Sequence, residues 1–129
     1  MSTDGLAVAA GRAIAVGRVA TGAGLLLAPK LTRAWIGDLG PGAEVVARAL
    51  GVRDLVMGGI TLHTIDHPQV GPRWVATCAV ADAVDGAATL AARRALPRIG
   101  AVGVSVAAFG AAATGLAAAV ALRTRAKAE

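Results

Sequence analysis

The feature that most restricts the fold of this chain is an apolar run at residues 99–122, "IGAVGVSVAAFGAAATGLAAAVAL", which holds no charged residue over 24 positions. An α-helix rises about 1.5 Å per residue, so about 20 such residues cross the roughly 30 Å hydrocarbon core of a bilayer. Three further apolar runs of similar length lie at residues 6–28, 43–62 and 74–92, and proline- and glycine-containing segments separate them. The sequence therefore predicts four transmembrane helices in a single domain, residues 1–129.

Composition agrees with a lipid environment. Hydrophobic residues make up 56% of the chain and charged residues 16%, against about 45–50% and about 25% in soluble domains. Backbone polar groups in lipid must be satisfied internally, so runs of this length with little two-residue alternation predict an all-α bundle of four helices. The net charge of +5 is spread in short clusters at the ends of the runs, and the chain has one Phe and no Tyr for base stacking. The expected partner is therefore the lipid bilayer and not nucleic acid.

Small residues recur at helical spacing along one stripe of each run. In the second run Ala47, Gly51, Asp54 and Gly58 follow one another at i, i+4, i+7 and i+11, and the other runs repeat this spacing. Lipid supplies no hydrophobic drive between helices, so small residues at such positions let helix backbones approach closely. We therefore expect packing contacts at six glycines: Gly11, Gly22, Gly51, Gly58, Gly103 and Gly110.

Six charged residues lie inside the first three runs, near mid-depth: Arg18, Arg48, Arg53, Asp54, Asp82 and Asp85. A charge at the bilayer centre costs about 2.5–3.5 kcal/mol on insertion scales, so three arginines and three aspartates should pair inside the bundle. Their depths pair Arg18 with Asp54 or Asp82, and Arg48 with Asp85. Arg53 lies about 100° around the helix from Asp54, so we expect the two to share no partner direction, and Arg53 reaches Asp82, the side of the bundle that carries Arg18, or another protein.

Two interpretations of this predicted ion network stay open. In the first, the protein is a structural or accessory membrane component, a homo-oligomer or a small subunit of a larger membrane complex, and the ion pairs fix helix order. In the second, it is a small transporter or proton-linked carrier that uses the mid-depth charges. A water-filled cavity that reaches Asp82 favours the carrier, and a dry, fully paired network favours the structural role. The sequence contains no catalytic constellation and no cofactor motif, so we do not expect an enzyme.

The segment "HTIDH" places His63 and His67 four residues apart with Asp66 beside the second histidine. On a continuous helix the two imidazoles would share a face, as metal ligands do. Pro68 follows at once and no third strong ligand is visible, so a turn is expected and these histidines are only weak metal candidates. The linker at residues 29–42 contains Trp35 and is interpreted either as a segment lying at the membrane interface with an aromatic anchor or as a plain loop.

Three stretches carry a resemblance: "LLLAPKL" at the end of the first run, "RALGVRDLVMG" in the second and "ADAVDGAATL" in the third. Together they resemble a family of small four-helix integral membrane proteins of bacteria, frequent in actinobacteria, whose function is unknown. The composition, rich in Ala and Arg and poor in Lys, fits a high-GC bacterium. The resemblance implies a multi-pass protein of the bacterial cytoplasmic (inner) membrane and an important role for Arg48, Arg53, Asp54, Asp82 and Asp85.

Overall fold

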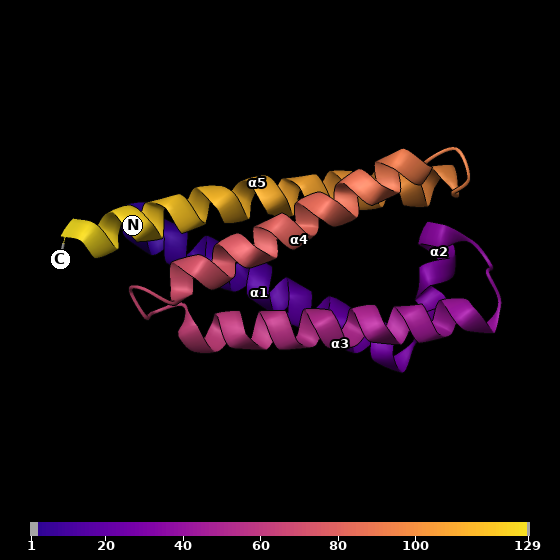
Figure 1. Cartoon of the computed structure of the whole chain (residues 1–129), viewed down its shortest axis with the longest axis horizontal. Helices are drawn as coiled ribbons and strands as arrows, with labels where there is room; N and C mark the ends of the chain where they lie inside the picture. Colours follow the sequence, from indigo (N-terminus) through magenta and orange to yellow (C-terminus); the bar gives the residue numbers. More distant parts are fainter. Residues whose placement is uncertain (1–2, 129) are drawn as a thin grey trace.

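The computed structural model describes residues 3–128, and this part of the chain forms five α-helices and one 3-10 turn (Figure 1). Four helices are long and two elements are short. In chain order they are α1 (Thr3–Leu27), η1 (Pro29–Thr32), α2 (Arg33–Ile36), α3 (Pro41–Thr64), α4 (Gly71–Ala92) and α5 (Arg98–Ala128). The predicted all-α class is confirmed, and each predicted apolar run lies within or at the edge of one long helix.

Three of the long helices are long and apolar enough to cross a membrane: Gly5–Leu27, Gly71–Ala92 and Arg98–Lys127. The helix α3 has the length but not the apolar composition, because Glu44, Arg48, Arg53 and Asp54 all lie in it. Length and composition therefore support three spans within the described residues. The predicted fourth span depends on where these charged side chains point.

The four long helices run antiparallel in sequence, so both described ends of the chain lie at the same end of the bundle (Figure 1). α1 packs along most of α3, α4 packs along most of α5, and contacts between α1 and α5 join the two pairs. α3 and α4 touch each other much less, although only a short turn at residues 65–70 links them. The bundle thus has closed seams on three sides and a loose seam between α3 and α4.

Glycine explains the closeness of α1 and α3. A Cβ added at Gly22 would lie 2.6 Å from the carbonyl oxygen of Gly51, and one added at Gly58 would lie 2.8 Å from that of Ala15. These distances are shorter than van der Waals contact, so only glycine allows the two backbones to touch at these points. Gly11 is buried against an isoleucine side chain from the turn that follows α3. The predicted packing role of Gly11, Gly22, Gly51 and Gly58 is confirmed.

The predicted packing face of α5 is wrong. Cβ atoms added at Gly103 and Gly110 would meet nothing within 4 Å, so these glycines face outward. Small residues occur on every side of this helix and no charge marks its inner face, so the spacing alone selected the wrong stripe. The buried stripe holds Ala101, Ser105, Gly115, Ala119 and Leu122.

The linker between α1 and α3 packs against the end of the bundle and forms η1 and α2, so it is not a plain loop. Its η1 turn buries Thr32, and α2 lies so close to α5 that a Cβ at Gly100 would overlap the carbonyl oxygen of Ala34. The indole Nε1 of Trp35 donates a hydrogen bond to Thr89 Oγ1 on α4 at 3.2 Å. Trp35 is therefore held inside the bundle, where it forms one wall of the site described next.

Candidate functional site: a charged cavity at mid-depth

Arg18 is the centre of the ion network. The Nη1 atom of its guanidinium donates to Asp54 Oδ1 on α3 at 2.7 Å. Its Nη2 atom donates to Asp82 on α4 and to the carbonyl oxygen of Cys78 at 3.1 Å. The Arg18 side chain is only 4% exposed. Both partners predicted for Arg18 are confirmed, and one residue ties α1 to α3 and to α4.

Arg53 forms the second half of the network. Its Nη1 and Nη2 atoms donate to Asp85 Oδ1 and Oδ2 at 3.0 and 2.6 Å, a two-pronged pair across the loose seam between α3 and α4. Its Nε and Nη2 atoms also donate to Asp54 Oδ1, at 3.1 and 3.0 Å. The prediction that Arg53 and Asp54 share no partner direction is wrong, because the long arginine side chain curls back over its own helix.

Arg48 lies outside this network, which corrects the predicted pair with Asp85. Its side chain is 53% exposed, and its guanidinium lies 4.0 Å from Glu44, one turn earlier on the same helix. Arg48 precedes Asp54 by six positions, and this offset places Arg48 about 120° around α3 from Asp54 on the buried stripe. Depth alone made it a candidate, and its helical face points it away.

Because Arg48 lies outside the network, the positive and negative side chains within the network are not equal in number. The network contains three carboxylates, Asp54, Asp82 and Asp85, and two guanidiniums, Arg18 and Arg53. One carboxylate of the network is therefore not matched by a positively charged side chain. Asp82 Oδ2 and Arg18 Nε are buried and have no hydrogen-bond partner among the described residues. The network therefore lacks one positive charge and has spare hydrogen-bonding capacity.

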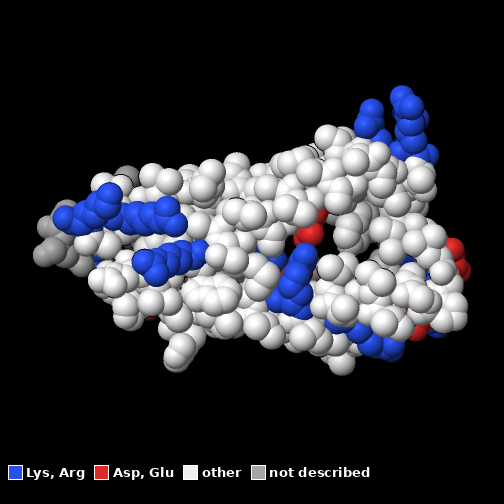
Figure 2. All heavy atoms as spheres, in the orientation of Figure 1, with Lys and Arg blue, Asp and Glu red and all other residues white. Residues whose placement is uncertain are grey.

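All five network residues line a cavity of about 480 Å³ that reaches from α1 to α5. The rest of its wall is mostly apolar, and Thr21 and Thr32 add two hydroxyl groups. Figure 2 shows acidic and basic atoms at a hollow near the middle of the face on which Figure 1 draws α3 and α4. The exposed fractions of the Arg53 and Asp85 side chains, 33% and 25%, place this pair at an opening between α3 and α4, and exposed lining residues on α1 and α5, Gly17, Thr21 and Ala107, lie at a second side of the cavity. The apolar lining includes Ile14, Leu25, Leu31, Trp35, Leu50, Val104, Ala107, Ala108 and Ala111.

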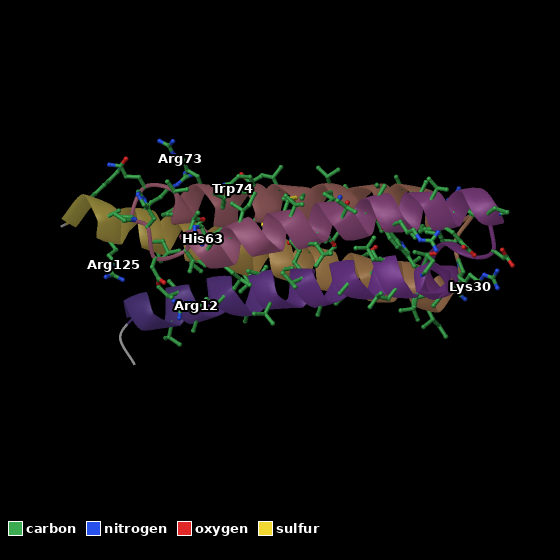
Figure 3. The ribbon with its side chains drawn as sticks, turned by 90° about the horizontal axis from the view of Figure 1, so that it is seen from below. Arg12, Lys30, His63, Arg73, Trp74 and Arg125 are labelled. Atoms are coloured by element: carbon green, nitrogen blue, oxygen red, sulfur yellow. The ribbon has the colours of Figure 1, made fainter. Side chains whose placement is uncertain are left out.

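The segment with His63 and His67, the weak metal candidates, lies at the C-terminal end of α3. His63 lies on the last turn of α3, at the end of the bundle that also carries Arg12, Arg73 and Arg125 (Figure 3). His67 lies beyond the helix, and its Nδ1 accepts backbone N–H groups of the following turn at 3.3 Å. The helix ends between the two histidines, so they share no helical face. Across residues 3–128 no three His, Cys, Asp or Glu side chains gather where they could hold a metal ion.

Two parts of the site were not found from the sequence. Trp35 lines the cavity and is held by its hydrogen bond to Thr89, and the carbonyl oxygen of Cys78 helps to hold Arg18. The only signal for the first was a tryptophan in a linker longer than an antiparallel connection needs. No sequence signal marks a single helix carbonyl as an acceptor.

No family model, curated protein or solved structure matches this chain. The resemblance of "RALGVRDLVMG" and "ADAVDGAATL" to the family of small bacterial membrane proteins stays a prediction.

Proposed function

We propose that the protein is a four-helix integral membrane protein of a bacterial inner membrane that acts as a small proton-linked carrier. In this proposal the mid-depth cavity holds one exchangeable positive charge, which is either a proton or a cationic substrate. The single observation that carries the proposal is the charge balance of the cavity, where three carboxylates face two guanidiniums.

The outer surface of α3 supports its assignment as a fourth span. Asp54 is buried, and Arg53 points into the cavity, so two of its charges are withdrawn from lipid. Val45, Val52 and Val56 are half or more exposed and give the helix an apolar outer side. Glu44 and Arg48 lie within the first two turns, near an interface where long side chains can reach water.

The missing charge supports a carrier over a purely structural network. An unpaired charge is costly in a medium of low dielectric, so a buried site with an excess carboxylate favours a bound counter-charge. The cavity reaches the surface beside Asp85, which gives that counter-charge a path to exchange. The ion pairs form one connected series, from Asp82 to Arg18, Asp54, Arg53 and Asp85, and this series holds the site ready for one added cation.

One observation favours the second candidate, an accessory structural protein. Arg18 alone joins α1, α3 and α4, as expected if the ion pairs served to fix helix order. The two candidates differ in what the loss of Asp82 does. In a structural network its removal should be as harmful as the loss of Arg18, whereas in the carrier it removes the excess charge and leaves the fold intact.

The test is infrared spectroscopy of the purified protein in lipid, across the physiological pH range. We expect one protonated carboxyl band that titrates and that disappears in Asp82→Asn, while Asp82→Asn keeps the melting temperature of the parent. Asp66→Asn is the matched control, because Asp66 is exposed and pairs with Arg12 at the end of the bundle. A network with no titrating carboxyl, in which Asp82→Asn unfolds as readily as Arg18→Leu, overturns the carrier in favour of the structural role.

A further inference from the structure

We propose that the ligand of this cavity is an amphiphilic organic cation, a protonated amine with an apolar body, which enters from the hydrocarbon layer through the seam between α3 and α4. This inference rests on the proposed function and adds to it the substrate class and the entry route.

The charge of the head group follows from the network. Both guanidiniums already pair with carboxylates, so no free cation is available to hold an anionic ligand. Asp82 Oδ2 is a buried acceptor without a partner among the described residues. An ammonium group would supply both the missing positive charge and an N–H donor to this oxygen, and a charge-assisted hydrogen bond of this kind is among the stronger ones.

The shape of the rest of the ligand follows from the wall. The uncharged part of the cavity lining is mostly aliphatic, from Ile14 on α1 to Val104 on α5. The Trp35 ring also lines the cavity, and its hydrogen bond to Thr89 fixes its orientation, so it can pack against an apolar body or face a cation. The volume of about 480 Å³ lies in the usual range for small-molecule sites, about 300–1,000 Å³. A two-chain phospholipid is too large for it.

The entry route follows from the loose seam. α3 and α4 make few contacts with each other, and Arg53 and Asp85 bridge the space between them while partly exposed. The outer surfaces of the two helices carry exposed valines, Val52 and Val56 on α3 and Val80 and Val84 on α4. A ligand that reaches the opening from the side therefore crosses an apolar surface first. This favours a lipophilic cation over a hydrated inorganic ion.

Binding of the ligand and release of a proton are linked by charge. The ammonium group keeps its own proton and adds one positive charge beside Asp82. A proton that had balanced Asp82 then leaves to bulk water, so the total charge of the cavity is unchanged. Each bound amine should release about one proton into a weakly buffered solution.

The chain offers a built-in reporter, because Trp35 lines the cavity and Trp74, the other tryptophan, lies at the opposite end of the bundle (Figure 3). In a Trp74→Phe background in lipid nanodiscs, Trp35 emission is titrated with 4-phenylbutylamine, 4-phenylbutanol and 4-phenylbutyrate. We expect saturable quenching or a spectral shift with the amine, and affinities about tenfold or more weaker for the alcohol and the carboxylate. Trp35→Phe with Trp74 retained should show no saturable signal.

Two variants separate the head-group claim from the apolar-body claim. Asp82→Asn should weaken amine binding about tenfold or more and abolish proton release, whereas Asp66→Asn should change neither. Ala108→Leu fills the cavity without touching a charge and should weaken binding of the amine, and Ala117→Leu on the outer side of α5 is its control. If Asp82→Asn does not fold, the inference is tested by whether Ala108→Leu weakens amine binding.

Equal binding of the alcohol and the amine, in parent and Asp82→Asn alike, would mean simple apolar partitioning and would overturn the inference. Tighter binding of the carboxylate would identify an anion site and overturn it as well. If no probe binds but the titrating carboxyl of Asp82 is present in the infrared spectrum, the substrate class is wrong while the proton site stands. If that carboxyl is absent too, both proposals fail.

Discussion

The two seams that α3 makes with its neighbours are built in opposite ways. Toward α1, Gly51 and Gly58 bring backbone against backbone, and the Leu26 and Val19 side chains of α1 pack against these glycines. Toward α4, the helices stay apart at mid-depth, and the Arg53–Asp85 pair reaches across an open space. One helix thus carries a close-packed side and a charged, partly exposed side, and the two sides are set by residue size and side-chain reach.

The difference shows what each kind of contact can do. A glycine seam gains from dispersion along its whole length and tolerates no added atom, so it is suited to hold the fold. A seam bridged by an arginine–aspartate pair leaves volume between the helices and can open by a rotamer change of the arginine. Only the second kind leaves room for a ligand, and that is where the cavity lies.

The largest effect is expected from Arg18→Leu, because Arg18 on α1 binds carboxylates on both α3 and α4. Its loss leaves three carboxylates against one guanidinium in a buried site, and breaking a buried pair costs about 3–5 kcal/mol. Melting temperature in detergent should fall sharply and expression should drop. Adding Asp82→Leu restores the original excess of one negative charge and should recover part of the loss. Additive losses in the double variant would show that these two residues do not act as a pair.

A smaller effect is expected in the close-packed seam. Gly51→Ala puts a Cβ 2.8 Å from the carbonyl oxygen of Gly22 and should destabilise by about 1–3 kcal/mol. Gly59→Ala is the control, because it lies on the same helix and meets nothing within 4 Å. It should be neutral or up to about 1 kcal/mol more stable. Equal melting temperatures for the two variants would mean that α1 and α3 are not in backbone contact.

The smallest effect on stability is expected from Arg53→Gln in the loose seam, on the order of 1 kcal/mol. This variant also leaves three carboxylates against one guanidinium, but the Arg53 and Asp85 side chains are 33% and 25% exposed, so solvent screens the charge that is left, unlike at the 4% exposed Arg18. Its effect on access should be larger. Cys78 is buried on α4 and contacts Thr61 of α3 at 3.3 Å, so its labelling by a membrane-permeant thiol reagent reports opening of this seam. Labelling should accelerate in Arg53→Gln and stay at the parent rate in Arg48→Gln. An unchanged rate in both would mean that the Arg53–Asp85 bridge does not close the seam.

The sequence by itself determined the helical class, the positions of the long helices and the inner faces of α1, α3 and α4. These follow from chain length against bilayer thickness, and from charges and small residues that share one stripe. Arg18, Asp54 and Asp82 were placed together correctly because each lay on such a stripe at the same depth. On each of these three helices, a charge that lay on the small-residue stripe marked the buried face, whereas Arg48, which lies off that stripe, faces outward.

Tertiary structure alone decided the rest. The inner face of α5 could not be read from its sequence, because its residues are uniformly small or apolar and many rotations bury similar surface. Arg48 and Arg53 lie at comparable depths, and only the rotation of α3 sends one into the cavity and the other outward. The excess carboxylate, the fixed Trp35 and the cavity itself follow from how far each side chain reaches once four helices have packed. The spacing of residues along one helix does not tell how far their side chains lie from residues on the other three long helices.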